Sequence, residues 1–135
     1  MSQLPLRTSK SSLSIVERAY RGSLEEQYGH IVWLTRIMKA MGAPTAIMLK
    51  GDTVLYATRH QPRSGLSLGD IRIEALSHYE SSIQSLLDLQ VPVYAWGPDL
   101  ARLALRVEEL IPGVRPLDHA ALIDLIRRLD CVWYW

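Results

Sequence analysis

Cysteine is almost absent from this sequence, and phenylalanine is missing altogether. The single cysteine, Cys131, cannot form an internal disulfide, and it cannot by itself hold a structural zinc ion. No apolar run approaches the ~20 residues that a membrane-spanning helix needs. The polar first residues also lack the apolar core of a secretory signal. We therefore expect a cytoplasmic protein with no membrane-embedded part.

The charges of the chain nearly cancel. Fifteen Lys and Arg residues against fourteen Asp and Glu residues leave a formal net charge of +1. So small a net charge produces no strong electrostatic attraction to nucleic acid or to a membrane surface, and we expect neither as a partner. Hydrophobic residues make up 48% of the 135 residues, which is the balance of one ordinary globular domain. We expect a flexible arm over residues 1–11 and one folded domain over residues 12–135.

Apolar runs of strand length alternate with segments of helical spacing. Segment 53–58 fits either a short helix or a strand, and the polar segment 59–69 is expected to be a mobile loop. The alternation predicts one three-layer α/β sandwich with a mostly parallel sheet. The predicted strands are 13–20, 45–49, 91–96 and 131–135, with an extended piece at 114–117. The predicted helices are 24–41, the second half of 71–89, 98–110 and 118–129.

Three of these helices carry start signals. The helix after Trp96 has Pro98 at its first position and Asp99 in its first turn. Ser23, with Glu26 three residues later, forms a capping box at the first helix. Asp118 is the expected N-cap of the last helix. We expect the apolar stripe of that last helix to be buried: Leu122, Ile123, Ile126 and Leu129.

The carboxyl ends of parallel strands are where ligands collect, and four polar residues follow predicted strands. Arg21 and Ser23 could bind a small anion at a helix N-terminus, or Ser23 only caps its helix while Arg21 is solvated. Asp52 is either an acid or base at the rim or a turn residue, and Asp99 is a charge at a helix start. Glycine-rich phosphate-binding patterns are absent, and the four histidines show no metal-ligand spacing. We expect no cofactor and no metal.

The only candidate thiol nucleophile is Cys131, in the last predicted strand beside Asp130. Reactive thiols need an exposed, electropositive setting, so an inert cysteine fits this position better. Large aromatic side chains gather in the last two long strands and either fill the core or contact another subunit. These are Tyr94, Trp96, Trp133, Tyr134 and Trp135.

Four pieces of the chain, taken in order, carry a family resemblance over about residues 13–135. The first is the strand with the Tyr20-Arg21-Gly22-Ser23 turn and its long helix, and the second is the run from Ile47 to Val54. The third is the run 91–96 and the fourth the run 129–135. In this order the chain resembles the DsrE/DsrF-like sulfur-relay family.

This resemblance implies a flavodoxin-like α/β domain that assembles into trimers or hexamers with identical or different DsrE/F-like subunits. A sulfur-carrier protein is a further partner that it implies. In active members a cysteine after the central strand accepts persulfide sulfur, whereas here that position matches Trp96. The resemblance therefore implies a non-catalytic subunit of an assembly for sulfur oxidation or reduction, or for tRNA thiolation. Two alternatives stay open: a persulfide carrier that uses Cys131, and a small-anion binding module at the strand ends.

Overall fold

Strands and helices alternate along the chain in the computed structural model, which describes residues 10–18, 26–61, 66–73 and 79–135. The elements are β1 (Ser12–Val16), α1 (Glu26–Ala40), β2 (Thr45–Leu49), η1 (Gly51–Ala57), β3 (Leu66–Leu68), β4 (Ile71–Ile73), α2 (Tyr79–Asp88), β5 (Val93–Trp96), α3 (Gly97–Arg102), η2 (Val107–Glu109), β6 (Arg115–Leu117), α4 (His119–Arg127) and β7 (Cys131–Tyr134). The 3-10 helices are those labelled η.

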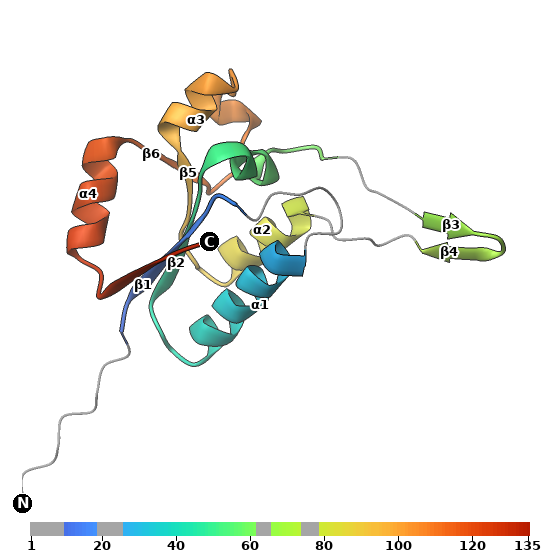
Figure 1. Cartoon of the computed structure of the whole chain (residues 1–135), viewed down its shortest axis with the longest axis horizontal. Coiled ribbons are helices and arrows are strands. Elements are labelled where there is room, and N and C mark those ends of the chain that lie inside the picture. The colour runs from blue at the N-terminus through green and yellow to red at the C-terminus, as the bar shows by residue number, and fades with distance from the viewer. Residues whose placement is uncertain (1–9, 19–25, 62–65, 74–78) are drawn as a thin grey trace, which may run out of the picture.

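Five strands form one sheet in the order β6-β5-β2-β1-β7. All four neighbouring pairs are parallel. The central strand β2 is buried at every position, because a continuous apolar run suits a strand that is covered on both faces. The predicted α/β fold with a mostly parallel sheet is confirmed (Figure 1).

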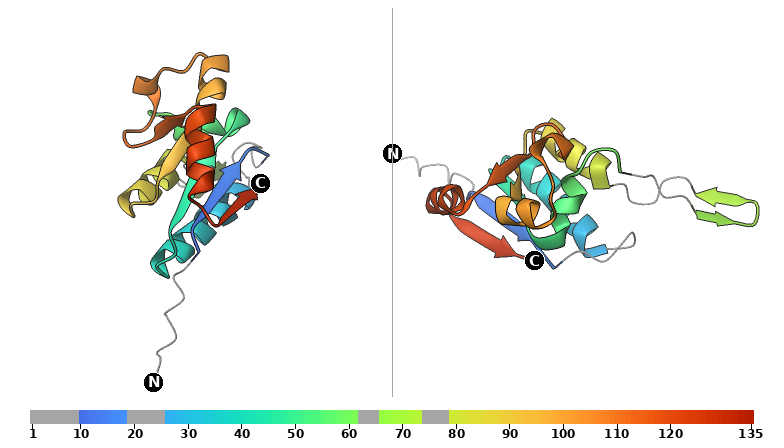
Figure 2. Two further views of the ribbon diagram at one scale, coloured as in Figure 1. Left: turned by 90° about the vertical axis from the view of Figure 1, so that its left-hand side faces the viewer. Right: turned by 90° about the horizontal axis from the view of Figure 1, so that it is seen from above.

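Helices cover both faces of this sheet, which gives three layers. Figure 2 shows α4 on one side of the sheet and the pair α1 and α2 on the other. Ile31 of α1 and Ile83 of α2 belong to the larger core cluster, together with Val16 and Leu49 of the strands. A smaller cluster on the opposite face contains Leu13, Ile15, Ala46, Met48, Trp96 and Leu117, with Leu122, Leu125 and Leu129 packed against it.

The first strand is shorter than the predicted segment 13–20. It ends at Val16, and the next two amides, of Glu17 and Arg18, both donate to the carbonyl of Trp135 at 2.9 and 2.8 Å. Two consecutive N–H groups cannot point to one neighbour in a regular strand, where they alternate in direction. The chain therefore leaves the sheet at this point. The Ser23 capping box lies outside the described residues.

The helix after β5 is also shorter than predicted. It ends at Arg102 instead of Leu110, because the amides of Ala104 and Leu105 turn back to Ala101 and Leu100, at 3.1 and 2.8 Å. This paired bonding is a Schellman motif, and it places Ala104 at φ 53°. Glycine usually occupies that position, so with alanine there the sequence does not indicate that the helix ends.

Part of the predicted loop 59–69 is ordered into a hairpin. Strands β3 and β4 pair antiparallel, and Gly69 opens the two-residue turn between them with φ 59°. A glycine followed by Asp70 between apolar residues is a hairpin signal that the loop interpretation overlooked. The undecided segment 53–58 lies mostly within the 3-10 helix η1.

The last helix begins where predicted, because the side chain of Asp118 accepts a hydrogen bond from the amide of Ala121 at 2.7 Å. The prediction that its whole apolar stripe is buried is wrong: Ile123 and Ile126 are exposed. Leu122, Leu125 and Leu129 pack toward the sheet, and a helix on the outside of a sheet buries only one side.

The residue before β1 is linked to the residue before β7. The backbone amide of Ser11 donates to Asp130 Oδ2 at 2.8 Å, and this hydrogen bond lowers the pKa of Asp130. Residues 1–9 of the predicted arm lie outside the described residues. Of the described helices, none combines the length and the apolar character needed to cross a membrane.

Candidate functional site

The carboxyl edge of the parallel sheet brings together residues from five strand ends. Glu17 follows β1, Lys50 follows β2 and Trp96 ends β5. Beyond β6 the chain enters α4 through His119, and Tyr134 ends β7. This is the edge where parallel sheets bind their ligands, so it is the candidate site.

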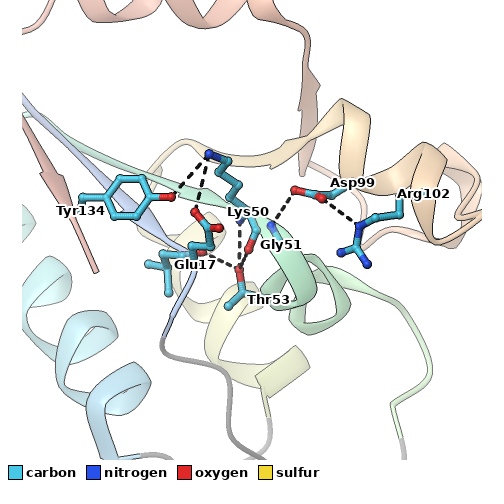
Figure 3. Close-up of polar contacts among 8 residues, drawn as sticks. Glu17, Lys50, Gly51, Thr53, Asp99, Arg102 and Tyr134 are labelled. Carbon is cyan, nitrogen blue, oxygen red and sulfur yellow. Dashed lines mark hydrogen bonds and ion pairs between the residues drawn. The ribbon is translucent and has the colours of Figure 1, made fainter.

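A lysine at this edge links three strands (Figure 3). Lys50 Nζ lies 3.6 Å from Glu17 Oε2 and 3.4 Å from the hydroxyl of Tyr134. It also lies 5.6 Å from the centre of the Tyr134 ring, in the range of a cation–π contact. Glu17 Oε2 is buried and makes no hydrogen bond among the described residues, so the ammonium group balances its charge.

A buried threonine fixes the backbone beneath this lysine. The Thr53 side chain is fully buried, and its Oγ1 atom accepts a hydrogen bond from the Lys50 amide at 3.0 Å. The same hydroxyl lies 2.6 Å from the Val16 carbonyl and 2.7 Å from the Lys50 carbonyl. It has one proton, so it donates to one carbonyl at a time. The hydroxyl thereby joins the ends of β1 and β2.

Two acids and an arginine connect η1 to α3. Asp99 Oδ2 accepts the Gly51 amide at 2.6 Å, and Asp99 Oδ1 accepts Arg102 Nε at 3.1 Å (Figure 3). Arg102 Nη2 reaches Asp52 Oδ1 at 2.8 Å. The hydrogen bonds to Asp52 and then Asp99 raise the pKa of Arg102 further above its ordinary value. Asp52 and Asp99, predicted separately, are thus held together by one guanidinium group.

The indole of Trp96 is buried between the carboxyl edge of the sheet and α4. Trp96 is 7% exposed, and its ring meets the imidazole of His119 edge-on, with the centroids 4.7 Å apart. Trp96 belongs to the core cluster beneath α4. A large apolar side chain therefore fills the end of β5.

The only thiol lies at the other end of the sheet. Cys131 is the first residue of β7 and pairs with Ser12, the first residue of β1. Its side chain is half-buried, and Sγ lies 3.6 Å from the carbonyl of Ser11. The strands are parallel, so Cys131 lies at the amino edge, opposite the edge that carries Trp96 and Lys50.

The predicted aromatic contact residues divide into two groups. Tyr94 and Trp135 are half-buried, and each packs against one of the two core clusters. Trp133 and Tyr134 are exposed on the edge strand β7. The predicted anion-binding residues Arg21 and Ser23 lie outside the described residues.

Sequence analysis gave no role to several residues of this site. Lys50 directly follows the predicted strand 45–49, a position that could have marked it. Glu17 falls inside the predicted strand 13–20, and only the early end of β1 places it at a strand end. Arg102 lies three residues after Asp99 on a short helix, which is the usual spacing of a side-chain ion pair. Nothing in the sequence indicates the contact between Trp96 and His119, because it depends on how β5 and β6 pair.

The described polar side chains of this edge are held by contacts with one another. Sulfur transfer requires a thiolate, and the described residues at this edge carry amine, phenol, carboxylate and guanidinium groups instead. Within the described ranges, His, Cys, Asp and Glu side chains do not gather in groups of three that could hold a metal ion. The polar groups mostly bind one another and lock the strand ends to η1 and α3.

Comparison with known proteins finds likeness in structure alone. No family model and no curated protein sequence matches this chain. The YchN protein from E. coli has a similar structure, with a TM-score of 0.70 and 16% sequence identity, over 94% of this chain and 99% of that chain.

A second solved structure is similar over most of its length. It is MTH1491 from Methanobacterium thermoautotrophicum, a protein of unknown function, with a TM-score of 0.59 and 16% identity over 89% of this chain and 90% of that chain. At this identity the likeness extends to the fold and no further. The chain shares with both a three-layer α/β fold that is built on a mostly parallel sheet.

Proposed function

We propose that the chain is a non-catalytic DsrE-like subunit that builds or regulates a sulfur-handling assembly in the cytoplasm. Such an assembly oxidises or reduces sulfur compounds or thiolates tRNA, and its other members are DsrE/F-like subunits and a sulfur-carrier protein. The observation that carries the proposal is the buried Trp96 at the end of β5. By resemblance this position belongs to the cysteine that carries sulfur, and an indole cannot take part in thiol chemistry.

The position of the one available thiol supports the same conclusion. Cys131 begins an edge strand at the amino side of the sheet, and its sequence neighbour Asp130 is an acid whose pKa is lowered. A carboxylate that stays ionised is the wrong neighbour for a site that must hold a thiolate. We therefore favour a structural role over a persulfide carrier that uses Cys131.

The small-anion alternative has less support. The start of α3 carries the carboxylate of Asp99, which already accepts the nearby Gly51 amide. A second anion there would meet a like charge. If phosphate raised the melting temperature of the protein and Arg21→Ala abolished the rise, this alternative would replace the structural role.

The proposal is tested by offering sulfur to the purified protein. The wild-type chain and the Cys131→Ser variant are incubated with polysulfide, desalted and weighed intact without reductant. We expect equal masses, with no retained increment of about 32 Da per sulfur atom. An increment that the wild-type chain retains and Cys131→Ser lacks would support the carrier alternative.

Assembly is tested separately by light scattering at micromolar concentration. We expect an oligomer of this chain. A monomer, alone and after mixing with a cysteine-bearing DsrE-like subunit, would contradict the proposed structural role.

A further inference from the structure

The two edges of the five-stranded sheet differ in how they resist pairing with another chain. Edge strands expose unpaired backbone groups, and proteins protect them with proline and with charged side chains. The β6 edge has both, in Arg115 and Pro116. The β7 edge consists of Cys131, Val132, Trp133 and Tyr134, and it has neither. Among the described residues, no strand pairs with the outer side of β7.

Hydrogen bonding shows which backbone groups of β7 face outward. Cys131 N donates to Ser11 O at 3.2 Å, and Trp135 N donates to Ile15 O at 2.8 Å. These residues therefore face β1. Successive residues of a strand direct their N–H and C=O groups to opposite sides. The N–H and C=O groups of Val132 and Tyr134 consequently point away from the sheet, at the open edge.

The side chains of this edge are apolar and well exposed. Val132 is 39% exposed, Trp133 38% and Tyr134 52%. On the same face as Val132 and Tyr134 lies α4, where Ile123 and Ile126 are also exposed. The exposed edge thus combines free backbone groups with uncovered apolar area.

We propose that β7 pairs antiparallel with β7 of a second copy of this chain across a two-fold axis, with Trp133 of the two copies directly opposite each other. In this register Val132 of one copy faces Tyr134 of the other, twice. All four outward-facing groups of each strand are then satisfied by four hydrogen bonds between the chains. In any other two-fold register, the outward-facing groups of Val132 and Tyr134 do not all find hydrogen-bond partners on the second copy.

The strand suits a second copy better than an unrelated partner. It has no charge to be repelled by its symmetry mate, and opposing tryptophans form a favourable cross-strand aromatic pair. Two-fold dimers are also the commonest oligomers. The protected β6 edge keeps further copies from adding end to end, so the pairing joins two copies in one continuous sheet, a two-fold contact that a hexamer also contains. The pairing deepens the proposed function, because it names the contact on which an assembly of this chain would rest.

Disulfide trapping tests the register directly. In a Cys131→Ser background, Trp133→Cys places two thiols opposite each other at a non-hydrogen-bonded pair, where the Cα atoms are about 4.5 Å apart. That distance lies within the range of disulfides. We expect a covalent dimer on mild oxidation at micromolar concentration. The matched control is Trp33→Cys in the same background, because Trp33 is an exposed tryptophan on α1. It should stay monomeric on a denaturing gel.

Light scattering of a second pair of variants tests the energetics. Trp133→Lys puts two ammonium groups across the axis, and we expect it to weaken dimerisation by at least about tenfold. Trp33→Lys should leave the mass of the particle unchanged. Circular dichroism checks that both variants fold, and if Trp133→Lys does not fold, the disulfide experiment alone decides.

The outcomes separate this inference from the proposed function. An oligomer that persists in Trp133→Lys and gives no Trp133→Cys disulfide would refute the edge pairing and leave the structural role intact. Retained sulfur on Cys131 would refute the structural role and leave the pairing intact. A wild-type chain that stays monomeric would refute the pairing.

Discussion

Removing the carboxylate of Asp99 is the most direct way to disrupt the hydrogen bonds that join η1 to α3 at the sheet edge. Asp99 is 16% exposed at its side chain, and its Oδ2 atom accepts the Gly51 amide at 2.6 Å. A hydrogen bond to a charged group contributes about 1.5–3 kcal/mol, and the partner left behind is a partly buried amide. The ion pair with Arg102 adds little to this, because the guanidinium group is half exposed. We expect Asp99→Ala to lower the free energy of unfolding by about 2–3 kcal/mol.

Two matched variants separate the two contacts of Asp99. Arg102→Ala removes only the ion pairs and should lower the free energy of unfolding much less than Asp99→Ala, because exposed ion pairs contribute little. Asp99→Asn keeps a neutral acceptor for the Gly51 amide and should lie between the two alanine variants. The measurement is urea unfolding followed by circular dichroism, with hydrogen exchange of the Gly51 amide as a local readout. Equal losses for Asp99→Ala and Arg102→Ala, or an unchanged exchange rate at Gly51, would refute this reasoning.

Three further predictions concern the backbone and the acid stability of the fold. Ala104→Gly should raise the free energy of unfolding by about 0.5–1 kcal/mol, because Ala104 has φ 53° and glycine adopts a positive φ without strain. The control Ala101→Gly, inside α3, should lower the free energy of unfolding by about as much. Denaturant unfolding measures both changes. Gly97→Ala should lower the free energy of unfolding by about 1–3 kcal/mol in the same assay, because a Cβ atom there would lie 2.9 Å from the carbonyl oxygen of Leu117 in β6. A smaller loss would contradict the close packing of α3 against β6. The lowered pKa of Asp130 stabilises the fold above about pH 4, and this contribution is lost as the pH falls through the folded-state pKa. Unfolding of Asp130→Asn should therefore depend less on pH between about pH 5 and pH 2, and an unchanged pH profile would contradict the hydrogen bond from Ser11.

The fold was predictable because its strands are encoded locally. Continuous apolar runs predict buried parallel strands, and the run Thr45–Leu49 becomes the central strand β2 at the predicted positions. Asp118 likewise marks the start of α4 correctly. The errors arise where the backbone takes an uncommon conformation without the usual residue. Ala104 occupies a position where glycine is normal, so the end of α3 could not be seen in the sequence.

The site was predictable only as a location. Asp52, Trp96 and Asp99 lie at one edge of the sheet, as expected for residues that follow or end parallel strands. Which partners they contact depends on the strand order, and Arg102 joins two acids that lie 50 and 3 residues away in the sequence. Exposure of Ile123 and Ile126 could not be predicted either, because helical spacing shows that a stripe is apolar and does not show how much of it the sheet covers.

The role of the sheet edge is tested most directly by comparing two thiol positions within one chain. One protein is the wild type, whose only thiol is Cys131, and the other is Trp96→Cys in a Cys131→Ser background. The second protein is expected to lose about 3–5 kcal/mol of stability, so its fold is checked by circular dichroism. Both are incubated with polysulfide and weighed intact. We predict a retained increment of about 32 Da per sulfur atom on the Trp96→Cys protein and none on the wild type. Retained sulfur on Cys131 of the wild type, with none at position 96, would contradict the view that this chain is a structural subunit without a carrier thiol.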